Sequence, residues 1–245
     1  AFTNYRKAMA RRSEDPKVYL ELSRMYMQKD SLRKAYEFGE KTLRMSLENV
    51  QELQQGIVRK LEGNQNLAEM QSAESEGMKF KEMNELAIHA FEFVTTSFPQ
   101  KDIMPLLKSL RQDYPQSGRL LYLISQYYQK HEKNEEALLL LKESVRLAPN
   151  LGKVHKALGA YYQESNHIIQ AIQSYERALS VAPEEELYIK LIELYRETGR
   201  LNWLCERWFA KYRANPNNKL LKEYLIAALH KADRFEEAKQ LIKER

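Results

Sequence analysis

The chain has 245 residues, a formal net charge of +5 at pH 7, 30% charged residues and a mean hydropathy of −0.65. No stretch approaches the roughly 18 consecutive apolar residues of a membrane-spanning helix, and the single cysteine, Cys205, excludes an internal disulfide framework and any multi-cysteine metal site. Only eight glycines and seven prolines are available for turns, which disfavours a sandwich or barrel and predicts an all-α chain.

Prolines recur at a nearly constant spacing in the second half of the chain. Pro115, Pro149 and Pro183 are 34 residues apart, and Pro216 follows 33 residues later. Because proline cannot continue a helix, recurring prolines mark recurring helix ends. The spacing therefore predicts a chain built from helical repeats.

Apolar residues between these prolines have the spacing of amphipathic helices. In residues 152–183, His155, Leu158 and Tyr162 fall on one helix face, and a second set begins with Ala171 and Tyr175. Two such helices form a hairpin that cannot bury both apolar faces alone. Stacked copies of the hairpin can bury them, as in a solenoid.

Residues 152–184 resemble a tetratricopeptide repeat (TPR). Small, aromatic and proline residues occupy the characteristic motif positions, namely Gly159, Tyr162, Ala171, Tyr175, Ala178 and Pro183. Other parts of the chain match the same register with fewer of these residues. The resemblance implies an all-α fold in which antiparallel helix pairs stack into a right-handed α-solenoid, the TPR superhelix.

The register of the copies predicts the domain organisation. Complete repeats are expected at residues 16–49, 84–117, 118–151, 152–184 and 185–218. Residues 1–15 are expected to be the second helix of a truncated repeat, and residues 219–245 a terminal, incomplete repeat. The chain is therefore interpreted as an excised piece of a longer array, or as a mature product cut within one.

Residues 50–83 match the motif least well. Gly56, Lys60 and Glu69 stand at positions that the motif reserves for core residues. Two interpretations stay open, a degenerate TPR or a long-helix insertion in which one helix runs on from Leu32 through Leu61. The acidic, Met- and Gln-rich residues 62–83 could also form a mobile break between two sub-arrays.

The resemblance implies a concave groove lined by the first helix of each pair. The side chains predicted to bind a partner there are Arg119, Tyr122, Gln126, Lys130, Lys153, Lys156 and Lys190. Exposed aromatic rings beside cationic groups suit an acidic or carboxylate-bearing peptide segment. The alternative is that these lysines and arginines only keep the groove hydrated.

The sequence offers no catalytic, cofactor-binding or metal-binding pattern. The histidines are scattered without metal-ligand spacing, at His89, His131, His155, His167 and His230. Cys205 lies beside Leu204 and near Trp208, with no base to activate it, which predicts a buried structural thiol. Neither an enzyme nor a bound cofactor or metal ion is therefore expected.

These observations together predict a non-catalytic protein–protein interaction scaffold whose partner is a protein or peptide. Nucleic acid is disfavoured because aromatic residues that could stack on bases fall on repeat core positions, namely Tyr26, Tyr128, Tyr162, Tyr175, Tyr195 and Trp208. The alternative is a structural spacer or oligomerisation segment that acts through its convex face or its ends, near residues 2–9 and 235–242. The compartment is not determined, since one cysteine fits the cytoplasm, which is slightly favoured, and fits an exported protein as well.

Overall fold

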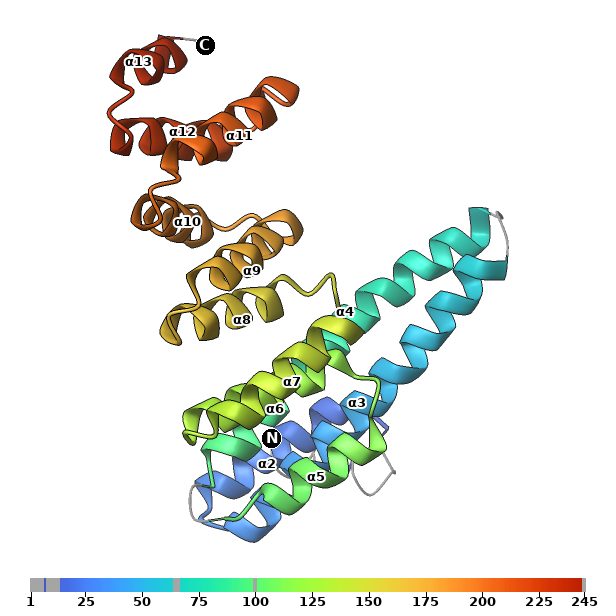
Figure 1. Cartoon of the computed structure of the whole chain (residues 1–245). Coiled ribbons are helices and arrows are strands. Elements are labelled where there is room, and N and C mark those ends of the chain that lie inside the picture. The colour runs from blue at the N-terminus through green and yellow to red at the C-terminus, as the bar shows by residue number, and fades with distance from the viewer. Residues whose placement is uncertain (1–6, 8–13, 64–66, 99–100, 244–245) are drawn as a thin grey trace. The chain divides into compact units, whose positions relative to one another are not determined.

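The computed structural model describes residue 7 and residues 14–63, 67–98 and 101–243. Every regular element within these ranges is an α-helix, so the predicted all-α fold is confirmed (Figure 1). The chain divides into two compact units, Ala1–His131 and Glu132–Arg245, each with its own packing. The helix predicted in residues 1–15 falls almost wholly outside the described residues.

The first unit contains the helices α2 (Pro16–Gln28), α3 (Leu32–Gly63), α4 (Leu67–Thr96), α5 (Met104–Asp113) and α6 (Gly118–Lys130). Proline lies in the first turn of both α2 and α5, where its missing N–H costs no hydrogen bond. The Asp15 side chain caps α2 by accepting a hydrogen bond from the backbone N–H of Lys17 at 2.9 Å. Local sequence signals thus explain where these helices begin.

Helices α3 and α4 form a long hairpin, visible as the extended blue-to-cyan pair in Figure 1. They have 32 and 30 residues, and together they include residues 50–63 and 67–83. These two stretches are thus the distal parts of two long helices. Near its other end the hairpin is tightly packed, since a Cβ on Gly39 would lie 3.1 Å from side-chain atoms of both Phe93 and Val94.

The second unit contains α7 (Asn134–Leu147), α8 (Gly152–Glu164), α9 (Ile168–Val181), α10 (Glu185–Glu197), α11 (Leu201–Ala214), α12 (Lys219–Lys231) and α13 (Phe235–Lys243). Pro149, Pro183 and Pro216 lie in the connections after α7, α9 and α11. One continuous core runs from Ala171 to Leu241, so neighbouring pairs bury one another's apolar faces.

The turns within the helix pairs share one backbone feature, a single residue in the left-handed region. The φ angles are 57° at Asp30, 60° at Glu132, 58° at Asn166, 68° at Gly199 and 59° at Asp233. From Glu132 onward these positions are 34, 33 and 34 residues apart. The backbone therefore repeats with the same period as the prolines. The left-handed residues lie in the turns within helix pairs, whereas the prolines lie in the connections between pairs.

Candidate functional site

Helix α6 presents four of the predicted binding residues on one face. Arg119, Tyr122, Gln126 and Lys130 are separated by three or four residues, the spacing that aligns side chains along a helix. The opposite face is buried in the first unit. The Ser117 side chain caps the helix by accepting a hydrogen bond from the backbone N–H of Leu120 at 3.3 Å. This group of four side chains is called the α6 face below.

Arg119 is the unusual member of the α6 face. Its side chain is half-buried, yet its guanidinium has no hydrogen bond or ion pair with any described residue. Burial lowers the pKa of Arg119, and this effect exceeds the opposing influence of nearby Glu85 and Tyr122. A guanidinium carries five N–H donors, so this group is available to a planar acceptor such as a carboxylate.

The rest of the α6 face is polar and borders a small hollow. The Gln126 side-chain amide donates a hydrogen bond to the Tyr122 hydroxyl at 2.8 Å, which fixes both side chains. Gln126 and Lys130 line a cavity of about 80 Å³ together with Glu92 and Thr96 of α4. The cavity is too small for a whole ligand, but it could accept one side chain of a partner.

Lys156 and Lys190, predicted to belong to the same groove, lie in the second unit and are already paired. Lys156 Nζ lies 2.8 Å from Glu184 Oε2 and 2.5 Å from Glu186 Oε2, and Lys190 Nζ is 3.8 Å from Glu186 Oε1. These contacts raise the pKa of Lys156, mainly through hydrogen bonds to Glu184 and then Glu186. Lys153 on α8 is exposed and has no ion pair among the described residues.

In the second unit, the positive charges of two lysines are thus balanced by the negative charges of two glutamates. Positions along a single helix do not predict this pairing, because Lys156 and its glutamates belong to different helix pairs. A signal was present, since Glu186 stands at the second position of the repeat that follows Lys156. The predicted set therefore divides into the α6 face, with its unpaired Arg119, and a lysine cluster whose charge is largely neutralised.

Outside these faces, Cys205 and His155 are both buried. Cys205 is fully buried, and burial raises the pKa of its thiol to about 11, so the thiolate is scarce at neutral pH. His155 is buried and its Nε2 lies 2.8 Å from the Pro149 carbonyl oxygen. Within the described ranges, no group of three or more His, Cys, Asp or Glu residues could hold a metal ion. No described helix is both long enough and apolar enough to cross a bilayer.

The helices and turns define an all-α repeat protein built from helix pairs. No family model matches the chain, and a sequence comparison with curated proteins finds no match. A crystal structure of MamA is similar at 18% identity and a TM-score of 0.39, over 69% of this chain and 90% of that one. The crystal structure of YrrB, described as a TPR protein with an unusual peptide-binding site, is 16% identical with a TM-score of 0.39, over 94% and 97% of the two chains. At these low scores neither structure bears on the partner of this chain.

Proposed function

We propose that the chain is a non-catalytic protein–protein interaction scaffold that binds an acidic segment of a partner protein through the α6 face. The observation that carries this proposal is the half-buried Arg119 guanidinium, which has no ion pair among the described residues. Partly buried guanidinium groups form strong, often bidentate hydrogen bonds with carboxylates. Tyr122 and Gln126 lie beside it and add an aromatic ring and a carboxamide to the same surface.

The lysines of the second unit take a smaller part in this proposal. A partner carboxylate that approached Lys156 would have to compete with Glu184 and Glu186, which already bond it. Lys153 is exposed and contributes long-range attraction that salt screens. The acidic segment is therefore expected to depend on Arg119 far more than on Lys156.

Site-specific photo-crosslinking tests this proposal. A photoreactive amino acid replaces Gln126 on the α6 face or, as a control, the exposed Lys142 on α7. In cells of the source organism we expect a partner to crosslink at position 126 and not at position 142. Arg119→Gln should remove that adduct, whereas Lys108→Gln, a charge loss of equal size on α5, should leave it. An adduct that survives Arg119→Gln would contradict the proposal.

A structural role is the second candidate, supported by exposed apolar side chains on the last described helix. Phe235 is 46% exposed and Ile242 is 60% exposed on α13. Apolar groups that lie together on a surface favour association. Sedimentation over a range of concentrations would detect self-association, and Phe235→Ser with Ile242→Ser should abolish it if this helix forms the contact.

A further inference from the structure

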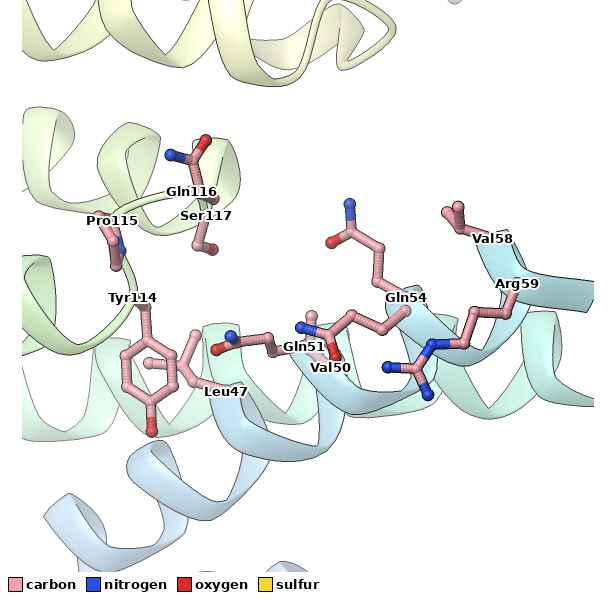
Figure 2. A pocket seen from close by; sticks show the side chains of 11 residues that line it. Leu47, Val50, Gln51, Gln54, Val58, Arg59, Tyr114, Pro115, Gln116 and Ser117 are labelled. Atoms are coloured by element: carbon pink, nitrogen blue, oxygen red, sulfur yellow. The ribbon is translucent and has the colours of Figure 1, made fainter. Parts of the chain in front are cut away.

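A separate cavity lies in the first unit, between α3 and the turn that joins α5 to α6. Its volume is about 390 Å³, and it shares no residue with the α6 face (Figure 2). The turn and the end of α5 are anchored to α3 by one contact each. The Tyr114 hydroxyl donates a hydrogen bond to the Arg44 carbonyl oxygen at 3.1 Å, and the Arg44 guanidinium bonds Asp113 at 2.8 Å. The cavity walls are therefore tied to each other.

The length of α3 creates this cavity. The turn with Tyr114 and Pro115 lies against the stretch of α3 near Leu47 and Val50, and α3 then continues to Gly63. Figure 2 shows the turn on one side of the cavity and the side chains of Gln54 and Val58 on the continuing helix. Val58 is 44% exposed, so this part of α3 presents an apolar side chain to solvent.

The lining combines an apolar floor with a rim of carboxamides. Leu47 and Val50 are buried at the floor, with 5% and 8% of their surface exposed. The rim carries four glutamine side chains without a hydrogen bond to any described residue, namely Gln51, Gln54, Gln55 and Gln116. Arg59 is the only charged residue of the lining, and it has no ion pair among the described residues.

This chemistry fits the main chain of an extended peptide. Each residue of an extended segment presents one N–H and one C=O, and a carboxamide can donate to one and accept from the other. A helix satisfies these groups internally and would leave the carboxamides unused. From Gln51 to Val58 the helix rises about 10 Å, which matches about three extended residues.

We propose that this cavity binds a short extended peptide with one large apolar side chain seated on Leu47 and Val50. The neighbouring acidic side chain of the peptide pairs with Arg59, the single cation of the lining. The volume lies within the range of roughly 300–1,000 Å³ that is typical of ligand-binding pockets. The site has no residue in common with the α6 face and would give the chain a second recognition surface with a different requirement, an apolar anchor in addition to an acid.

A phage-displayed library of random heptapeptides, selected on the whole chain, tests the proposal. We expect enriched peptides to contain one large apolar residue with an acidic residue close to it. Gln51→Ala combined with Gln54→Ala should weaken their binding about tenfold, which corresponds to about 1.4 kcal/mol. The matched control, Gln170→Ala with Gln173→Ala, removes two exposed glutamines of α9 and should leave binding unchanged. Arg59→Gln should remove the preference for an acidic residue and keep the apolar requirement.

A second measurement does not depend on the variants. In methyl NMR spectra, the enriched peptides should shift the resonances of Leu47 and Val50 and leave those of Leu225, in the core of the second unit, in place. Absence of enrichment, equal binding to the double glutamine variant, or shifts confined to other parts of the chain would each overturn the proposal. Loss of binding on Arg119→Gln alone would assign the selected peptides to the α6 face instead.

Discussion

The substitution Gly159→Ala tests how tightly helices α8 and α9 pack. A Cβ at Gly159 would lie 2.7 Å from Cδ1, 2.8 Å from Cε1 and 3.0 Å from Cγ of the Tyr175 ring. Tyr175 is fully buried, and its hydroxyl donates a hydrogen bond to Gln163 Oε1 at 3.0 Å. The ring can therefore move aside only by disturbing the core or by losing this bond.

Two opposing effects set the magnitude. Alanine is favoured over glycine within a helix by about 1 kcal/mol. Forcing a methyl group into a closely packed core costs about 1–3 kcal/mol. Because the new methyl group would be too close to three atoms of one ring, we place the cost near the upper end of this range. The net effect of Gly159→Ala is then a loss of about 1–2 kcal/mol in the free energy of unfolding.

Urea denaturation followed by far-ultraviolet circular dichroism measures this change. The matched control is Gly77→Ala in α4, where a Cβ would meet nothing within 4 Å. The control isolates helix propensity and should raise the urea midpoint slightly. The cost of Gly159→Ala should also fall in a Tyr175→Leu background, because the smaller side chain leaves room. A midpoint raised as much by Gly159→Ala as by Gly77→Ala would refute the packing argument.

Three further predictions concern a cap, a thiol and an ion pair. Asn218→Ala removes the acceptor that bonds Leu221 N at 2.9 Å, and thermal denaturation should show a loss of about 1 kcal/mol that Asn217→Ala does not cause. Burial raises the pKa of Cys205 to about 11 from its ordinary 9.0, so the unfolded chain ionises first. Stability should therefore fall as the pH rises from about 9 towards 11, and urea midpoints of Cys205→Ala should fall less over this range. Lys156→Glu places a third carboxylate beside two others and should lower the melting temperature more than Lys156→Gln, by a margin that salt reduces.

The positions of the later helices could be predicted from the sequence because each break has a strong local cause. Pro149, Pro183 and Pro216 prevent helix continuation at fixed intervals, and the helices of the second unit end before them. The turns within pairs were harder to predict. Glu132 and Asp233 adopt the left-handed conformation without a glycine, so their sequences carry a weak signal.

The long hairpin could not be derived from the repeat register. The chain has no proline between Pro16 and Pro99, so no proline interrupts a helix in this stretch. The expected boundaries at residues 50 and 83 came from extending the 34-residue period into this stretch, where the motif residues are absent. The repeat boundaries stay a prediction, while α3 and α4 follow the local preference of a proline-free sequence. The cavity beside Tyr114 depends on this extra length and has no counterpart in the repeat motif.

The two groups of predicted binding residues differ in what a ligand must displace. The face of α6 was predictable, because spacing along one helix determines which side chains align. The environment of each charged side chain could not be predicted in this way, because it depends on residues of the next helix pair. At Lys156 an incoming carboxylate exchanges one ion pair for another, since Glu184 and Glu186 already bond the ammonium group. At Arg119 no ion pair with a described residue has to be broken, and the guanidinium is already partly desolvated.

A hydrogen bond to a charged group contributes about 1.5–3 kcal/mol when it is gained without a competing partner. Arg119→Gln should therefore weaken partner binding by at least about tenfold, whereas Lys156→Gln should change it by a much smaller factor. Titration calorimetry with the partner identified by crosslinking would compare the two variants. Equal losses would mean that net positive charge governs binding, and that the unpaired state of Arg119 has no special role.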